Sequence, residues 1–182
     1  MSVEEIKNRK NACRELIKQR KQQFTVEELR QKSIVAVGNL LALPVMARAH
    51  TVMLYHSLPD EVDTHLLIHQ LISSKRIVLP VVCGKKAFPV ELRHEKDVSE
   101  GPYRIMEPQN PTVFSETIDV IVVPGVAFNR QGHRLGRGKG YYDGLLAHYP
   151  DVQKIGLCFD FQIVETIPTE QHDIIMDKII TD

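Results

Sequence analysis

The order of apolar and polar positions predicts a chain in which helices and short strands alternate. Two amphipathic helices are expected first. The first carries its apolar side chains on one face, at Ile6, Cys13, Leu16 and Ile17. The second begins after a capping-box pattern, Thr25 followed by Glu28, and is expected to end at Pro44. Both helices have a polar face, which predicts that they cover a core rather than lie inside it.

Runs that are apolar throughout predict buried strands. They occupy residues 51–55, 76–82, 118–123 and 154–159, with 174–176 and 179–180 as candidate final strands. A helix is expected at 64–73 and another from Tyr141. Strands of this kind, separated by helices, favour a mostly parallel sheet that is covered on both faces. The sequence therefore predicts an α/β fold, a single-domain Rossmann-like three-layer architecture with helices on both faces of the sheet.

One segment interrupts this regular pattern. Residues 84–116 are rich in Pro, Gly and charged residues, which predicts a short antiparallel excursion or an active-site flap. The total length of 182 residues fits one domain, and a domain of this size buries most of its apolar surface. We therefore expect residues 1–182 to form one unit.

A glycine-rich, cationic loop follows the strand at 118–123. Its glycines alternate with long cations in the order Gly132, Arg134, Gly136, Arg137, Gly138, Lys139 and Gly140. Glycines let backbone N–H groups converge, and a helix N-terminus adds about half a positive charge. The pattern predicts a polyphosphate site, with Asp143 placed to hold a magnesium ion. It matches neither the P-loop spacing nor the dinucleotide-binding Gly-x-Gly-x-x-Gly.

Two other interpretations of this loop exist: a solvated surface turn and an arginine-glycine RNA contact. Lys and Arg number 23, as do Asp and Glu, so the formal net charge is +0. Proteins that bind nucleic acid or anionic membranes usually have a basic excess, so neither partner is expected. No apolar run is long enough to cross a bilayer, and the N-terminal residues are charged. Cys13, Cys83 and Cys158 lack a Cys-x-x-Cys spacing and are expected to be buried thiols, which favours the cytoplasm.

Further polar groups have both a structural and a functional interpretation. Lys10 and Arg14 share a helix face and are either surface charges or phosphate ligands. Glu61 follows the strand at 51–55 and is either a helix-terminal acid or an acceptor for donor groups of a heterocycle. Ligands of open α/β sheets bind beyond the carboxyl ends of strands, so the Glu61 segment and the glycine loop are expected to face one cleft.

Metal and nucleophile patterns are weaker. His65 and His69 are four residues apart on a predicted helix, but no further ligand completes a zinc pattern. The spacing of the nearby acids at positions 60, 61 and 63 is not diagnostic of a metal either. His172 precedes Asp173, yet no serine or cysteine has the sequence context of a nucleophile elbow. Asp173 is more plausible as a second carboxylate near magnesium.

The sequence Gly-His-Arg-Leu-Gly-Arg-Gly-Lys-Gly-Tyr-Tyr-Asp at 132–143 closely resembles the signature of the 5-formyltetrahydrofolate cyclo-ligases, also called 5,10-methenyltetrahydrofolate synthetases. Weaker matches to the family pattern occur along the whole chain in the expected order. They lie at Lys10 with Arg14, 57–61 with Thr64, 105–108, 123–128, 156–159 with Gln162, and 167–168 followed by 172–173. The chain departs from the family pattern at Asn129, often Asp, at Val81, often Arg, and at Arg104, usually Gly.

The resemblance implies ATP-dependent cyclisation of 5-formyltetrahydrofolate to 5,10-methenyltetrahydrofolate through phosphorylation of the formyl oxygen, with release of ADP and phosphate. It implies Mg²⁺ as cofactor and ATP as co-substrate. The partners would be small molecules, the folate with or without a polyglutamate tail, and the protein a monomer or weak dimer. The alternative is a nucleotide- or folate-binding sensor without ligase activity.

The resemblance also assigns roles by position. Arg137, Lys139 and Tyr141 would be catalytic. The ATP-binding residues would be Lys10, Arg14, Arg134, Leu135, Gly136, Arg137, Gly138, Lys139, Gly140, Tyr141 and Tyr142. The folate would contact His56, Glu61, Arg137 and Tyr141. Asp143 and Asp173 would hold the magnesium ion.

Overall fold

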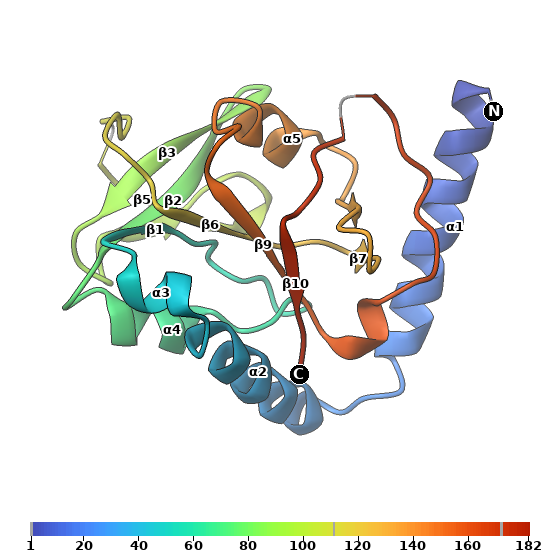
Figure 1. The fold of residues 1–182 in the computed structure, drawn as a ribbon, viewed down its shortest axis with the longest axis horizontal. Helices are drawn as coiled ribbons and strands as arrows, with labels where there is room; N and C mark the ends of the chain where they lie inside the picture. Colours follow the sequence, from blue (N-terminus) through green and yellow to red (C-terminus); the bar gives the residue numbers. More distant parts are fainter. Residues whose placement is uncertain (1, 111, 172) are drawn as a thin grey trace.

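A six-stranded sheet lies at the centre of the molecule in the strand order β10-β9-β6-β1-β2-β3 (Figure 1). The computed structural model describes residues 2–110, 112–171 and 173–182. The sheet strands are β1 (Thr51–Met53), β2 (Arg76–Cys83), β3 (Lys86–Leu92), β6 (Val120–Val123), β9 (Gln153–Leu157) and β10 (Lys178–Ile180). Neighbouring strands run parallel except β2 and β3, which pair antiparallel. The predicted, mostly parallel α/β sheet is confirmed.

Helices cover both faces of this sheet. One face is covered by α2 (Val26–Leu41), α3 (Pro44–Arg48) and α4 (His65–Leu71), and the other by α5 (Tyr141–Leu146) (Figure 1). Along β1, Val52 packs on the α2 side and Met53 on the α5 side, because successive side chains of a strand point to opposite faces. Each fully buried side chain of this kind stabilises the fold by about 1.5–3 kcal/mol.

The two N-terminal helices have the predicted caps. Thr25 accepts the backbone N–H of Glu28 at 3.2 Å, and Glu28 accepts the backbone N–H of Thr25 at 2.7 Å. The first helix, α1 (Val3–Lys21), has the same reciprocal cap at Ser2. It does not lie flat on the sheet: its buried Ile17 packs with Ala127 and Leu135, beyond the carboxyl end of β6 (Figure 1). This position brings the polar face of α1 to the carboxyl end of the parallel strands, where open α/β sheets bind their ligands.

The irregular region contains the predicted antiparallel excursion. After β3 the chain forms β4 (Val98–Glu100), a 3₁₀ turn η1 (Pro102–Arg104) and β5 (Met106–Pro108), and β4 pairs antiparallel with β5. A second small hairpin, β7 (Ala127–Phe128) with β8 (Arg134–Leu135), leads into the glycine loop. A further 3₁₀ turn, η2 (Asp160–Gln162), follows β9.

Two expectations from the sequence are wrong. Residues 174–176 form no strand: the Met176 N–H donates to the carbonyl of Gly132 at 2.8 Å, so this segment anchors the turn at Gly132 instead of joining the sheet. Cys83 is exposed, because it ends β2 at the tight turn into β3, beyond the covered part of the sheet, whereas Cys158 is buried as expected. None of the helices in the described ranges combines the length and apolar character that a membrane crossing requires.

Candidate active site

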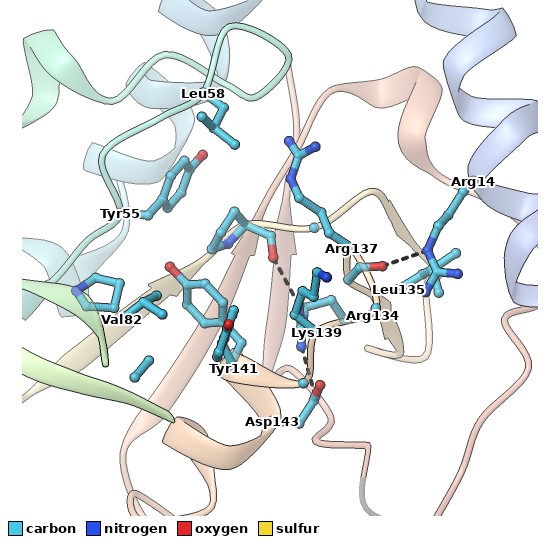
Figure 2. A pocket seen from close by; sticks show the side chains of 18 of the residues that line it. Arg14, Tyr55, Leu58, Val82, Arg134, Leu135, Arg137, Lys139, Tyr141 and Asp143 are labelled. Carbon is cyan, nitrogen blue, oxygen red and sulfur yellow. Dashed lines mark hydrogen bonds and ion pairs between the residues drawn. The ribbon is translucent and has the colours of Figure 1, made fainter. Parts of the chain in front are cut away.

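A cleft of about 860 Å³ opens beyond the carboxyl ends of β1 and β6 (Figure 2). Its walls come from α1, the segment after β1, the β2–β3 hairpin, residues 105–107, residues 134–143 and the C-terminal segment at Glu170 and Asp173. Segments from both ends of the chain therefore complete one cavity, at the position where open α/β sheets bind their ligands.

The two loops that the sequence placed at one cleft are in direct contact. Nη2 of Arg137, in the glycine loop, lies 2.6 Å from Oδ1 of Asp60 and 3.0 Å from Oε1 of Glu61. Burial alone would raise the pKa of Asp60, but the hydrogen bond and charge of Arg137 outweigh burial and lower it. In Glu61 burial prevails and raises the pKa, although Leu58 N–H and Arg137 both favour the charged form. Arg137 therefore links the glycine loop to the Glu61 segment.

The glycine loop has the backbone conformation that its sequence suggested. Gly138 has a φ of +89°, and Gly140, at the N-cap of α5, has a φ of +71°. Side-chain-bearing residues rarely adopt these angles, whereas glycine does so at little cost. At Gly136 the constraint is contact instead, since a Cβ would lie 2.8 Å from Nη1 of Arg134. The loop therefore needs glycine for two different reasons.

Arg134 lies beneath this loop rather than on its surface, with 4% of its side chain exposed. Its Nη2 is 2.8 Å from Oδ1 of Asp143, and its guanidinium carbon is 5.6 Å from the ring centre of Tyr142 (Figure 2). Within the described residues its Nε has no hydrogen-bond partner. Arg134 thus fixes the first turn of α5 and orients the Asp143 carboxylate at the edge of the cleft.

Helix α1 contributes the two predicted cations. Arg14 donates from Nε to the carbonyl of Gly136 at 3.0 Å and thereby holds the loop from outside (Figure 2). Nζ of Lys10 lies 2.8 Å from both Glu170 and Asp173. Burial would lower the pKa of Lys10, but the two carboxylates raise it, so this side chain is charged. Both residues therefore lie at the cleft, as the phosphate-ligand interpretation requires.

The side of the cleft opposite Arg14 carries apolar surface. Tyr55, Leu58 and Val82 lie there, away from Arg14, and Tyr141 stands between the two sides (Figure 2). The Tyr141 hydroxyl donates to the carbonyl of Gly84 in the β2–β3 turn at 3.3 Å. An aromatic ring system therefore fits on this side, and an anion fits on the cationic side.

The predicted magnesium ligands both line the cleft. Asp143 is bound by Arg134, and Asp173 by Lys10. Among the described residues no three His, Cys, Asp or Glu side chains group as a metal cage. His65 and His69 do not converge, because His65 contacts His56 and Asp63 while His69 contacts Glu95. His172 lies outside the described residues.

Two lining residues show features that the sequence alone did not indicate. Glu107 on β5 is 6% exposed, and its Oε1 accepts the Val82 N–H at 3.0 Å. Burial raises its pKa, and this hydrogen bond only partly opposes the shift. His56 lies 3.0 Å from His65, ring nitrogen to ring nitrogen. Burial, followed by the neighbouring His65, lowers the pKa of His56 to about 4. Glu107 reaches the cleft because β5 packs beside the β2–β3 hairpin.

Residues 6–182 match the model of the 5-formyltetrahydrofolate cyclo-ligase family. The chain belongs to the 5-formyltetrahydrofolate cyclo-ligase family. The match spans both walls of the cleft, from α1 to the C-terminal segment, so it includes every element that contributes to the site. The family resemblance of the glycine signature is thereby confirmed.

Individual relatives support the same family assignment. The 5-formyltetrahydrofolate cyclo-ligase of Escherichia coli K12 is 32% identical over 177 residues, covering 91% of this chain and 96% of the relative. The mouse cyclo-ligase is 26% identical and covers 99% of this chain and 97% of its own length. The NMR structure of Aquifex aeolicus 5,10-methenyltetrahydrofolate synthetase superposes with a TM-score of 0.84 at 33% identity, covering 94% of this chain and 88% of that one.

Proposed function

We propose that this chain converts 5-formyltetrahydrofolate to 5,10-methenyltetrahydrofolate and couples the ring closure to cleavage of ATP. The observation that carries the proposal is the contact between Arg137 and Glu61, which joins a cationic glycine loop to the segment after β1 across one cleft. A phosphate donor and a heterocyclic acceptor bound at these two walls would meet at Arg137.

The charge distribution of the cleft suggests where each substrate binds. Lys10, Arg14 and the backbone N–H groups of residues 135–140 supply positive charge and donors for the ATP phosphates. The wall formed by Tyr55, Leu58 and Val82 suits the folate ring system, and Glu61 is placed to accept its N–H groups. ATP and folate would therefore approach Arg137 from opposite sides.

The chemistry proceeds in two steps. The formyl oxygen attacks the γ-phosphorus of ATP, the bond to the bridging oxygen breaks, and ADP leaves. N10 of the folate then attacks the formyl carbon, phosphate leaves with the former formyl oxygen, and the N10 proton is released. Phosphorylation turns a poor leaving group into a good one, so the reaction needs no protein nucleophile.

Arg137 and Lys139 would stabilise the negative charge on the transferred phosphoryl group. Fixed cations and N–H donors act mainly by positioning and by charge stabilisation in such reactions. Arg137 is bound to Asp60 and Glu61 in this structure, so it would exchange part of this contact for the phosphate. Tyr141, between the two walls, would separate nucleotide from folate and align the formyl group (Figure 2).

The chemistry of the donor set fits magnesium. Mg²⁺ is commonly held by one or two carboxylates together with substrate phosphates and water, so a complete protein cage is not required. Asp143, oriented by Arg134 beside the glycine loop, would hold it, with Asp173 as the second carboxylate. A magnesium ion held by these carboxylates would neutralise negative charge on the phosphate groups.

The test is a turnover assay that follows the near-ultraviolet absorbance of methenyltetrahydrofolate. We expect product only when 5-formyltetrahydrofolate, ATP and Mg²⁺ are all present, with one ADP for each product. Product without ATP would refute the coupling. A folded protein that binds ATP and folate but makes no product would instead be the sensor.

A further inference from the structure

Three side chains connect the cleft to solvent beside the segment after β1. Nδ1 of His56 lies 3.0 Å from Nε2 of His65, and the two ring centres are 4.2 Å apart. Nδ1 of His65 lies 3.0 Å from Oδ1 of Asp63. His56 lines the cleft, whereas the side chains of His65 and Asp63 are 49% and 46% exposed. His56, at one end of this row of side chains, faces the cleft, and Asp63, at the other end, faces water.

The backbone around the two imidazoles is held by a dense set of hydrogen bonds. The Thr64 hydroxyl donates to the carbonyl of Tyr55 at 2.5 Å, and the Thr64 N–H donates to Oγ of Ser57 at 3.0 Å. The Asp63 N–H donates to Oγ of Ser33 on α2 at 3.1 Å. Because the segment is hydrogen-bonded to itself and to a packed helix, the backbone that carries the two rings is held in place.

This geometry defines which nitrogen of His56 is basic. A carboxylate only accepts hydrogen bonds, so we assign the proton of His65 to Nδ1, which lies 3.0 Å from Oδ1 of Asp63, and the lone pair to its Nε2. With this tautomer, the lone pair of His65 Nε2 accepts the Nδ1–H of His56, which leaves the lone pair of His56 on its Nε2. Nε2 has no hydrogen-bond partner among the residues that the structure describes. The pKa of about 4 keeps the imidazole neutral near pH 7.

The carboxylates of the cleft are already engaged. Glu61 accepts from Leu58 N–H and Arg137, and Glu107 accepts from Val82 N–H. The remaining carboxylates are each bound by a cation: Asp143 by Arg134, and Glu170 and Asp173 by Lys10. Among the lining side chains that the structure describes, His56 supplies a base with a ring nitrogen that no protein group contacts.

We propose that His56 is the general base that accepts the N10 proton during ring closure, with His65 and Asp63 passing that proton to solvent. The inference rests on the proposed function, which releases one proton in its second step. As N10 bonds to the formyl carbon, its N–H bond breaks and the electron pair stays on N10. The proton goes to Nε2 of His56, the Nδ1 proton of His56 moves to His65, and phosphate leaves with its bonding pair. As N10 donates its lone pair to the formyl carbon it gains positive charge, and its N–H becomes strongly acidic. A weak, neutral base is therefore sufficient to accept this proton.

The experiment separates the two chemical steps in His56→Ala. In a rapid-quench single turnover at saturating substrates, ADP reports phosphoryl transfer and the absorbance of methenyltetrahydrofolate reports ring closure. We expect ADP to form at a rate close to that of the unchanged chain, while ring closure slows by ~10²-fold, as is typical on removal of a general base. Added imidazole should restore ring closure without changing ADP formation.

His69→Ala is the matched control, because His69 lies on α4, the helix that also carries His65, and contacts Glu95, which does not line the cleft. Both rates should be unchanged in it. His65→Phe keeps an aromatic ring beside His56 but removes the relay nitrogens, and it should slow ring closure alone. Ring closure that keeps pace with ADP formation in His56→Ala would overturn the proposal and leave the departing phosphate as the base. Failure of the unchanged chain to form ADP with product would instead refute the proposed function.

Discussion

Gly138→Ala isolates the role of the glycine loop. At a φ of +89° an alanine is strained, and its Cβ would lie 3.3 Å from Nη2 of Arg14, which holds the loop. The left-handed conformation costs an L-residue about 1–2 kcal/mol. In a domain of this size each kcal/mol lowers the unfolding midpoint by about 2–4 °C, so the expected loss is about 2–8 °C.

The loss of activity should be far larger than this loss of stability. Displacing preorganised N–H donors by a fraction of an ångström weakens charge stabilisation, and we expect kcat/KM for ATP to fall by about 10²-fold. Gly84→Ala is the matched control, since Gly84 also has a positive φ, +61°, with open space around its Cβ position, and its carbonyl contact with Tyr141 is retained. The two variants should unfold at similar temperatures. Equal loss of kcat/KM in both would refute the assignment of the loop to ATP.

Three further variants test separate parts of the account. Arg137→Ala should lower turnover by at least ~10²-fold, as for other phosphoryl-stabilising arginines, yet change thermal unfolding little, because its side chain is 45% exposed. Glu61→Gln should reduce turnover, yet the variant should unfold at a higher temperature at pH 7. Because the pKa of Glu61 is raised in the folded protein, ionisation of this carboxyl lowers the free energy of unfolding as pH rises through that pKa, and glutamine does not ionise. The gain in unfolding temperature should therefore vanish at pH values below the ordinary carboxyl pKa. Arg104→Gly should raise the free energy of unfolding by about 0.5–1 kcal/mol in urea titrations, because Arg104 has a φ of +59°; unchanged stability would show that its conformation is unstrained.

Most helices and sheet strands were predictable because their signals are local, whereas β3 lies in the region that the sequence predicted to be irregular. The cap at Thr25 and the apolar runs that became β2, β6 and β9 define their elements without help from distant residues. Residues 174–176 carry a similar apolar signal but meet the Gly132 turn, where Met176 is buried without a strand partner. Only Met176 of this segment is buried, whereas Ile175 is 55% exposed, so a run of apolar residues does not by itself predict which side chains will be covered.

The site was predictable wherever backbone chemistry dictated it. The alternation of glycine and cation in the loop predicted an anion site, and the position of Glu61 after a parallel strand predicted that it lies at the same cleft, where it contacts Arg137. The burial of Arg134 and the approach of Glu107 were not predictable, because both depend on side-chain packing between elements distant in sequence. The departure from glycine at Arg104 was visible in the sequence, and the structure gives it a physical meaning in the positive φ.

Oxygen tracing tests the central claim most directly. The chain would be supplied with 5-formyltetrahydrofolate carrying ¹⁸O in the formyl group, together with unlabelled ATP and Mg²⁺, and the inorganic phosphate would be analysed by mass spectrometry. If the formyl oxygen attacks the γ-phosphorus, each phosphate released with methenyltetrahydrofolate carries one ¹⁸O. Phosphate without the label, formed alongside product, would show that ATP is cleaved by water and would contradict the account.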